Sequence, residues 1–198
     1  DYNTALPYLE RLEEQADIQQ NRTFAQSNLM KGYYGQRNYQ QTIAYAEKVL
    51  ATPTIDNRIK SDAQIMIARS AIQTNDENRA IDAYAEVLKI ATGETAAEAL
   101  YYDAYFKNKA GQHEASNTSV QKLAKDYSSY KEWGGKGLVL MAKNFYALDD
   151  AYQATYILES VIANFGQYPE LVAEAKGELA IIKSKESQSN SSVNPDGN

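Results

Sequence analysis

Few residues in this chain combine the type and the spacing that catalysis requires. His113 is the single histidine among 198 residues, and it falls in a predicted turn beside Gly111 and Glu114. A nucleophilic centre would need a Ser, Cys or second His that pairs with such a base, and the sequence places none with it. We therefore predict that His113 is an ordinary turn residue without a catalytic role.

Two adjacent pairs of carboxylates, Glu13-Glu14 and Asp149-Asp150, raise the question of acid–base chemistry. A glycosidase requires two carboxyl groups that face each other across a substrate, whereas neighbours in a helix point in different directions. We expect the first pair to be solvated near a helix end and the second to cap a helix. The sequence has no cysteine and no cluster of metal ligands, so we expect neither an enzyme nor a bound cofactor or metal.

The segment of residues 133–137, WGGKG, invites comparison with a phosphate-binding loop. It lacks the G-x-x-x-x-G-K-[ST] pattern, and no predicted strand precedes it. We expect a loop that leads into the following helix. Trp133, the only tryptophan, is expected to anchor this loop on the preceding helices, with contact to a partner as the alternative.

The charge of the chain argues against a nucleic-acid partner. Its formal net charge is −6, whereas binding to a phosphate backbone relies on clustered Lys and Arg. The sequence has no run of about 18 apolar residues that could span a membrane. It also has no basic stem followed by an apolar segment that would indicate a signal peptide, so we expect any targeting segment to lie outside these residues.

Self-similarity along the chain is the strongest signal in the sequence. Five segments carry a small residue, a packing residue four positions later and an aliphatic residue three positions after that. Their first members lie 36 to 38 residues apart, near the period of about 34 residues that is typical of one class of helix-pair repeats. The five triplets are Ala5, Leu9, Leu12; Thr42, Ala46, Val49; Ala80, Tyr84, Val87; Ser116, Val120, Leu123; and Ala154, Leu158, Val161.

A second amphipathic segment precedes four of the triplets, so each repeat is predicted to be a pair of helices. Short polar segments at residues 36–38, 74–77, 111–113 and 148–150 separate the two helices of each pair, and their composition suits tight turns. The apolar residues of the leading segments are Leu29, Met30, Tyr33; Ile67, Ala68, Ala71; Tyr101, Ala104, Tyr105; and Met141, Ala142, Phe145.

Residues 25–53 and 137–162 resemble tetratricopeptide (TPR) repeats, and the resemblance extends over residues 1–185. It implies an all-α fold, a right-handed α-α superhelical solenoid of TPR-like helix pairs. Some positions depart from the usual pattern of the family. They are Met30 in place of Gly or Ala, Thr42 and Ser116 in place of Ala, and Asp103 and Lys107, which interrupt the third repeat.

The pattern predicts four parts. Residues 1–18 look like the second helix of a repeat whose first helix is missing, which implies that the native protein extends upstream. Residues 19–168 form four TPR-like helix pairs. Residues 169–185 form a C-terminal capping helix that Pro169 opens, and residues 186–198 are expected to be disordered because they have almost no apolar side chains.

In the TPR family the first helix of each pair lines a concave groove, and equivalent positions form columns from repeat to repeat. The resemblance therefore implies a partner-binding surface, and three cations in one column would suit an acidic peptide. The alternative is that Lys and Arg only keep this face hydrated. The first column is Lys31, Arg69, Tyr105 and Lys143, and the second is Tyr34, Ile72, Asn108 and Tyr146.

These observations favour a non-catalytic scaffold that binds a protein or peptide, as the C-terminal part of a longer TPR protein. The resemblance is to TPR proteins of the bacterial cell envelope, which help to organise or assemble envelope components, so it implies a periplasmic or cell-envelope location. The alternative is glycan binding in an outer-membrane-associated module, because the chain has 16 tyrosines. Homo-oligomerisation stays open.

Overall fold

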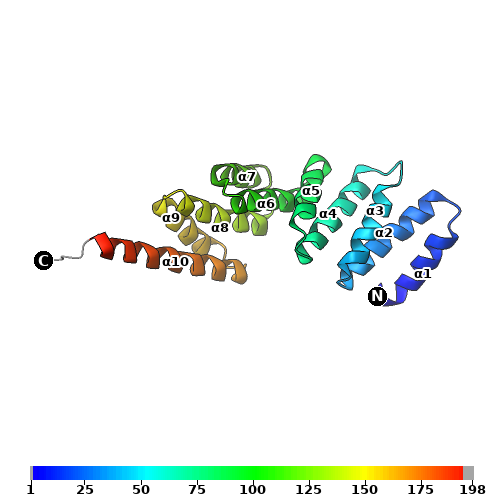
Figure 1. Cartoon of the computed structure of the whole chain (residues 1–198), viewed down its shortest axis with the longest axis horizontal. Helices are drawn as coiled ribbons and strands as arrows, with labels where there is room; N and C mark the ends of the chain where they lie inside the picture. Colours follow the sequence, from blue (N-terminus) through cyan, green and yellow to red (C-terminus); the bar gives the residue numbers. More distant parts are fainter. Residues whose placement is uncertain (1, 194–198) are drawn as a thin grey trace. The chain divides into compact units, whose positions relative to one another are not determined.

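The computed structural model describes residues 2–193, and over this range it contains ten α-helices and no strand (Figure 1). The chain divides into two compact units, residues 1–99 and 100–198, and each is described by itself; α6 contributes to both. The helices are α1 Tyr2–Gln15, α2 Gln19–Gly35, α3 Tyr39–Leu50, α4 Asn57–Gln73, α5 Glu77–Ile90, α6 Gly93–Lys109, α7 His113–Asp126, α8 Lys131–Ala147, α9 Ala151–Asn164 and α10 Pro169–Val193.

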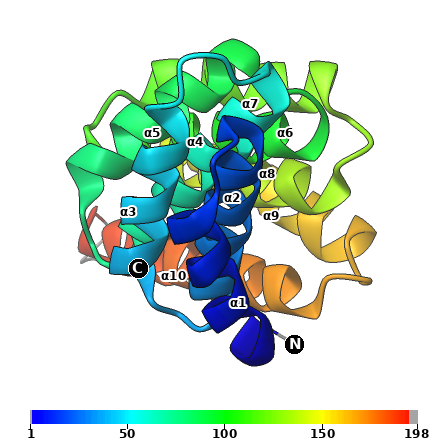
Figure 2. The ribbon, with the colours of Figure 1, turned by 90° about the vertical axis from the view of Figure 1, so that its right-hand side faces the viewer.

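In the first unit each helix packs against the next one along the chain, from α1 to α5. Figure 2 shows α1 beside α2, which it contacts. The first helices of successive pairs, α2 and α4, contact each other as well. Ala25 on α2, Ala46 on α3 and Ala63 on α4 are completely buried, and such small side chains let neighbouring helices approach closely.

In the second unit α7 packs on α8, α8 on α9 and α9 on α10, and the first helices α8 and α10 also contact each other. Its larger core cluster contains Val139 from α8, Leu158 from α9 and Leu171 from α10. A smaller cluster joins Ala104 of α6 to Val120 of α7 and to α8. The second unit therefore repeats the arrangement of the first, with a final helix laid on the last pair.

The structure confirms that the residues of the predicted repeat pattern form much of the core. In the triplets that begin at Thr42, Ala80, Ser116 and Ala154, every member is at most 2% exposed. The triplet that begins at Ala5 is only half-buried. Consecutive helices pack as neighbouring pairs in an all-helical chain, which is the α-solenoid arrangement that the spacing predicts.

The four turns within the helix pairs share one geometry. Each has a residue with a positive φ, and the amide of the next residue bonds to the carbonyl five positions earlier, at 2.9 Å in every case. This is the Schellman ending of a helix, in which a left-handed residue satisfies the last carbonyls. The left-handed residues are Arg37 (φ 59°), Asn75 (φ 57°), Gly111 (φ 73°) and Asp149 (φ 62°).

The residue after each left-handed position begins the next helix in the same way in three of the four turns. The side chains of Asn38, Asp76 and Asp150 each accept a hydrogen bond from the amide three residues later. An N-cap of this kind satisfies one of the otherwise unpaired amides of the first turn. Asp150 therefore caps a helix as predicted, whereas Asp149 supplies the left-handed residue.

Residues 133–137 do not form the predicted loop, because they lie inside α8. Two of the three glycines, Gly135 and Gly137, lie against side chains of other helices. A Cβ on Gly135 would clash with Leu171 and Phe165, and one on Gly137 would lie 3.1 Å from Val120. Tertiary packing thus accepts a sequence of low helix propensity. Trp133 packs on α6, the first helix of the preceding pair, as expected, with its ring centre 5.5 Å from that of Tyr101.

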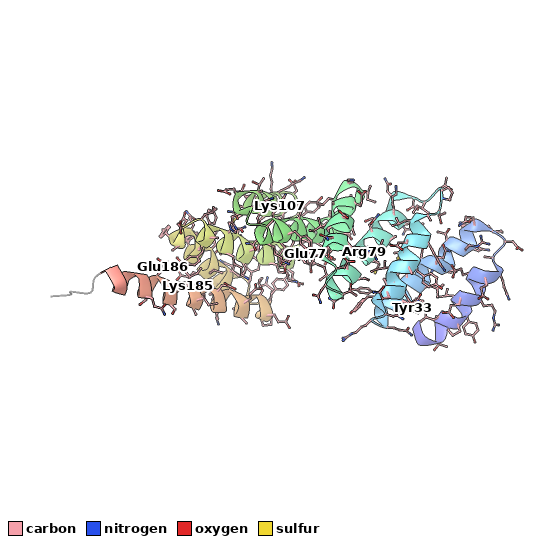
Figure 3. The ribbon with its side chains drawn as sticks, in the orientation of Figure 1. Tyr33, Glu77, Arg79, Lys107, Lys185 and Glu186 are labelled. Atoms are coloured by element: carbon pink, nitrogen blue, oxygen red, sulfur yellow. The ribbon has the colours of Figure 1, made fainter. Side chains whose placement is uncertain are left out.

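The prediction of a disordered tail from residue 186 was wrong for residues 186–193, because α10 continues to Val193. Two polar residues at the predicted end of this helix, Lys185 and Glu186, contact α8. Tyr146 of α8 hydrogen-bonds to Glu186, and Lys185 Nζ lies 5.7 Å from the centre of the Tyr146 ring. Lys185 and Glu186 are labelled on α10 in Figure 3. These polar contacts hold the helix against α8 at the position where the apolar pattern ends. Residues 194–198 of the predicted tail lie outside the described residues.

Candidate functional site on the first helices

The structure places all the predicted column residues on the first helices of the pairs, α2, α4, α6 and α8. The surface that these helices present is called the first-helix face. Lys31 and Tyr34 lie on α2 and Arg69 on α4, all in the first unit. The second unit holds the members on α6 and α8, which are Tyr105, Asn108, Lys143 and Tyr146. The columns are therefore considered as two sets, one in each unit.

Each of the three column cations pairs with a carboxylate on the next first helix. Lys31 Nζ lies 3.1 Å from Asp62 Oδ2 on α4. Lys143 Nζ lies 2.8 Å from Glu174 Oε1 and 3.2 Å from Glu178 Oε1, both on α10. Burial disfavours the Lys143 charge, but the hydrogen bonds to the two glutamates outweigh it and raise its pKa. These lysines therefore join successive repeats.

Arg69 makes the most buried of these pairs, within the first unit. Its Nε donates to Glu98 Oε1 at 2.9 Å, and Nη2 bonds to the second carboxylate oxygen. Glu98 is only 2% exposed and also accepts a hydrogen bond of 3.0 Å from Tyr84 Oη. The hydrogen bonds to Glu98 raise the pKa of Arg69. The Nε and Nη2 groups of Arg69 are thus committed to a structural ion pair.

Asn108 belongs to a hydrogen-bond network around Asn144 that the sequence did not reveal. Asn144 is completely buried. Its Nδ2 donates to Ser116 Oγ and Asn117 Oδ1, each at 2.8 Å. Its Oδ1 accepts from Asn108 Nδ2 at 2.7 Å and lies 3.1 Å from His113 Nδ1. Because Oδ1 can only accept, the His113 nitrogen donates in this contact.

The Asn144 network ties α6, α7 and α8 together. Ser116 Oγ donates in turn to the carbonyl of Ala104 on α6, at 2.7 Å. His113 is the first residue of α7 rather than a turn residue, and its ring serves this network. Asp103 and Lys107 also fit the third repeat, because they pair with each other at 2.7 Å and both bond to Ser119.

A cluster of aromatic rings surrounds the column residue Tyr105 in the second unit. Tyr101 and Tyr105 of α6 are stacked with ring centres 6.4 Å apart, and Trp133 of α8 lies against Tyr101. Lys136 Nζ lies 4.5 Å from the centre of the Trp133 ring. Burial raises the pKa of Tyr101 strongly. The rings are half-buried, so one part of this cluster packs the helices and another part meets solvent.

A similar combination of aromatic and acidic residues fixes α1 to the first helix pair. Tyr33, labelled in Figure 3, donates from Oη to Glu10 Oε1 at 2.5 Å, and its ring stacks on that of Tyr45 with the ring centres 5.5 Å apart. The hydrogen bond to Glu10, with burial, raises the pKa of Tyr33 to about 12. Glu13 is bound by Lys48 at 2.8 Å and by Gln26 at 2.9 Å, so the prediction that it is merely solvated was wrong.

The first-helix face of the first unit also contains a groove, which we call the α2–α4 groove. It has a volume of about 770 Å³ and lies between the N-terminal part of α2, the connection before α4 and the start of α4. Phe24 projects into it with 59% of its surface exposed, and the Lys31–Asp62 pair lines it as well. Lys31 is the one predicted site residue that lines this groove.

A second hollow, of about 560 Å³, lies on the opposite helices of the first unit, between α3 and α5 over α4. Its walls carry four carboxylates, and Arg79 bridges it by an ion pair of 3.8 Å to Glu47. Among the described residues, no group of three or more His, Cys, Asp or Glu side chains is arranged to hold a metal ion. This hollow thus differs from the α2–α4 groove in having no exposed aromatic ring in its walls.

Comparison with protein-family models finds no match for this chain, and comparison with curated proteins finds none either. Within residues 2–193, no helix is both long enough and apolar enough to cross a membrane. The fold thus defines the class of protein, an α-solenoid built of helix pairs. In its first unit, the first helices α2 and α4 form a groove.

Proposed function

We propose that this chain is a non-catalytic, TPR-like interaction module that binds a protein or peptide partner on its first-helix face. A stack of helix pairs offers a long surface without an enclosed pocket, which suits a macromolecular ligand better than a small substrate. The column cations are joined to carboxylates of the neighbouring helices. The binding surface is therefore assigned to the α2–α4 groove rather than to the columns.

The observation that carries this proposal is Phe24. A phenylalanine that leaves 59% of its surface in solvent gains free energy when a partner covers it, and exposed aromatic residues in a concave surface are typical anchors of protein interfaces. Its position in the α2–α4 groove gives the partner a hollow to fill. In this proposal the module is part of a longer TPR-like protein, and it holds its partner in the bacterial cell envelope.

Site-specific photo-cross-linking in the native cell tests this function. We expect p-benzoyl-phenylalanine at position 24 to capture one protein in stoichiometric yield, identified by mass spectrometry. The matched control is the same substitution at Tyr152, which is 76% exposed and lies on α9 in the second unit. Equal capture from both positions, or capture from neither, would contradict a binding face at the groove.

The aromatic cluster of α6 and α8 supports a second candidate function, the binding of glycans. Half-exposed rings such as Tyr105 and Trp133 offer faces on which sugar rings pack. If this candidate is correct, titration with cell-envelope oligosaccharides gives a saturable change in the fluorescence of Trp133, the single tryptophan. If the Trp133 fluorescence does not change during this titration, and position 24 captures a protein, the results favour the interaction module over glycan binding.

A further inference from the structure

We propose that the α2–α4 groove binds an extended peptide segment that places an apolar side chain on Phe24 and a carboxylate on Arg58. This inference rests on the proposed function and specifies the ligand of the same site. It concerns the first unit alone, since α2, α4 and the connection between α3 and α4 all belong to it.

The length of the groove fits a short extended peptide. Its lining residues on α2 run from Gln19 to Lys31. Between Gln20 and Lys31, which share one face of the helix, the rise of α2 is about 16 Å. An extended chain covers that distance with about five residues. A strand-like segment of that length can therefore lie along the groove.

The apolar part of the groove is small and defined. Phe24 is 59% exposed, and Ile55 and Ile59 are half-buried on the opposite wall. These three residues can cover one or two apolar side chains of a ligand, and the removal of that apolar surface from water favours binding. The rest of the lining is polar, so a wholly apolar ligand would leave those groups unpaired.

The polar lining suits a peptide backbone. Hydroxyl and amide side chains, such as Gln20, Ser27 and Thr54, line both walls. Such groups can donate to carbonyl oxygens and accept from amide hydrogens, both of which an extended peptide presents along its length. They therefore position the backbone, while the side-chain contacts of the ligand provide the selectivity.

The groove is lined by two cations, Lys31 and Arg58, and by two carboxylates, Asp56 and Asp62. Lys31 and Asp62 neutralise each other across 3.1 Å. Asp56 is occupied at the N-terminus of α4, where its Oδ1 accepts from the amide of Ile59 at 2.8 Å. Arg58 is exposed and has no salt-bridge partner among the described residues. Its guanidinium can thus form a bidentate pair with a carboxylate of the ligand.

A selection from random peptides tests this assignment with a defined probe. A phage-displayed library of random heptapeptides is selected on the full chain, and we expect enrichment of peptides with Asp or Glu within three residues of Phe, Leu, Ile or Met. Enrichment without an acidic residue overturns the proposed role of Arg58. Failure to enrich any peptide, together with binding of an oligosaccharide that depends on Phe24, overturns the peptide assignment in favour of a glycan.

The affinity of one enriched peptide, measured by fluorescence anisotropy, separates the two contacts. We expect Arg58→Glu and Phe24→Ala each to weaken binding by about tenfold or more. The matched control for charge is Lys60→Glu, because Lys60 is exposed on the same helix and does not line the groove. We expect it to change the affinity by less than about twofold. Equal effects of the two charge reversals overturn a specific contact with Arg58.

Charge reversal on both sides gives the most specific outcome. When the acidic residue of the peptide is replaced by Lys, we expect it to bind the Arg58→Glu variant better than the wild-type chain. Circular dichroism of each variant checks that its helices are intact. If the cross-linker at position 24 captures a partner and Arg58→Glu leaves that capture unchanged, the proposed interaction function stands and the carboxylate assignment fails.

Discussion

Two buried polar centres hold successive helix pairs together, and they use different physics. In the first unit Arg69 of α4 binds the carboxylate of Glu98 on α6, which Tyr84 also contacts. In the second unit the neutral amide of Asn144 on α8 bonds to residues of α6 and α7. Both centres lie beside members of the repeat triplets, Tyr84 in one case and Ser116 in the other.

The difference shows how one repeat geometry accepts either a charged or a neutral centre. The carboxylate of Glu98 is stable inside the protein only while Arg69 and Tyr84 surround it, because an unpaired buried charge is costly. The amide of Asn144 carries no charge, and its penalty arises only from hydrogen bonds that are lost. Removal of the two centres should therefore have unequal effects.

Arg69→Met gives the largest expected effect. It removes the counter-ion and leaves Glu98 buried, so we expect the free energy of unfolding to fall by about 3 kcal/mol. Hydrogen exchange resolved by peptide should locate the loss in α4 and α5. The double variant Arg69→Met, Glu98→Gln is the control, and we expect it to recover part of the loss because no charge remains. A double variant less stable than Arg69→Met would contradict the charged nature of this centre.

Asn144→Leu should have the next largest effect, a loss of about 2 kcal/mol, because the groups of Ser116, Asn117 and Asn108 would lose their partner. The fluorescence of Trp133, which lies in the same unit, reports the unfolding transition. Lys122→Leu serves as the control, since Lys122 is exposed on α7. If both variants unfold at the same urea concentration, the network does not stabilise the second unit.

The turns provide a smaller comparison between the units, because Arg37 and Gly111 occupy the same left-handed position. A side chain in this conformation costs about 1 kcal/mol relative to glycine. A Cβ on Gly111 would meet no atom within 4 Å. We therefore expect Gly111→Ala to lower the stability of its unit by about 1 kcal/mol and Arg37→Gly to raise that of the first unit by up to about 1 kcal/mol. Thermal unfolding measures both, and changes of the same sign would contradict the shared geometry.

The junction of α1 with the first helix pair should respond to alkaline pH. The pKa of Tyr33 is raised to about 12 from an ordinary value of 10.0, mainly by its hydrogen bond to Glu10. Its stabilising contribution is thus complete below pH 10 and is lost as the pH rises from about 10 to 12. We expect Tyr33→Phe to flatten this part of the stability profile in urea titrations, and the exposed Tyr8→Phe to leave it unchanged. Parallel profiles for Tyr33→Phe and the wild-type chain would contradict the assignment.

Local residue patterns were sufficient to predict the repeat. The triplet that contains Ala46 and Val49 shows why, since its members share one helical face and must be buried whatever the neighbouring helix is. The turn at Asn75 was predictable because Asn favours a left-handed backbone. Gly135 led the same reasoning to predict a loop, because it lies in α8 against Phe165 and Leu171, which are thirty or more residues away in the sequence.

The sequence by itself determined the helix pairs, the turns within them and the buried triplets of four repeats, because all of these follow from periodicity within single helices and from local turn chemistry. Only the tertiary structure decided which first-helix side chains are available to a ligand. Lys31, Arg69 and Lys143 look alike in sequence, yet each meets a carboxylate 29 to 31 residues further along the chain. Arg58 and Phe24 look unremarkable in sequence, and the packing of α2 against α4 places both in the groove.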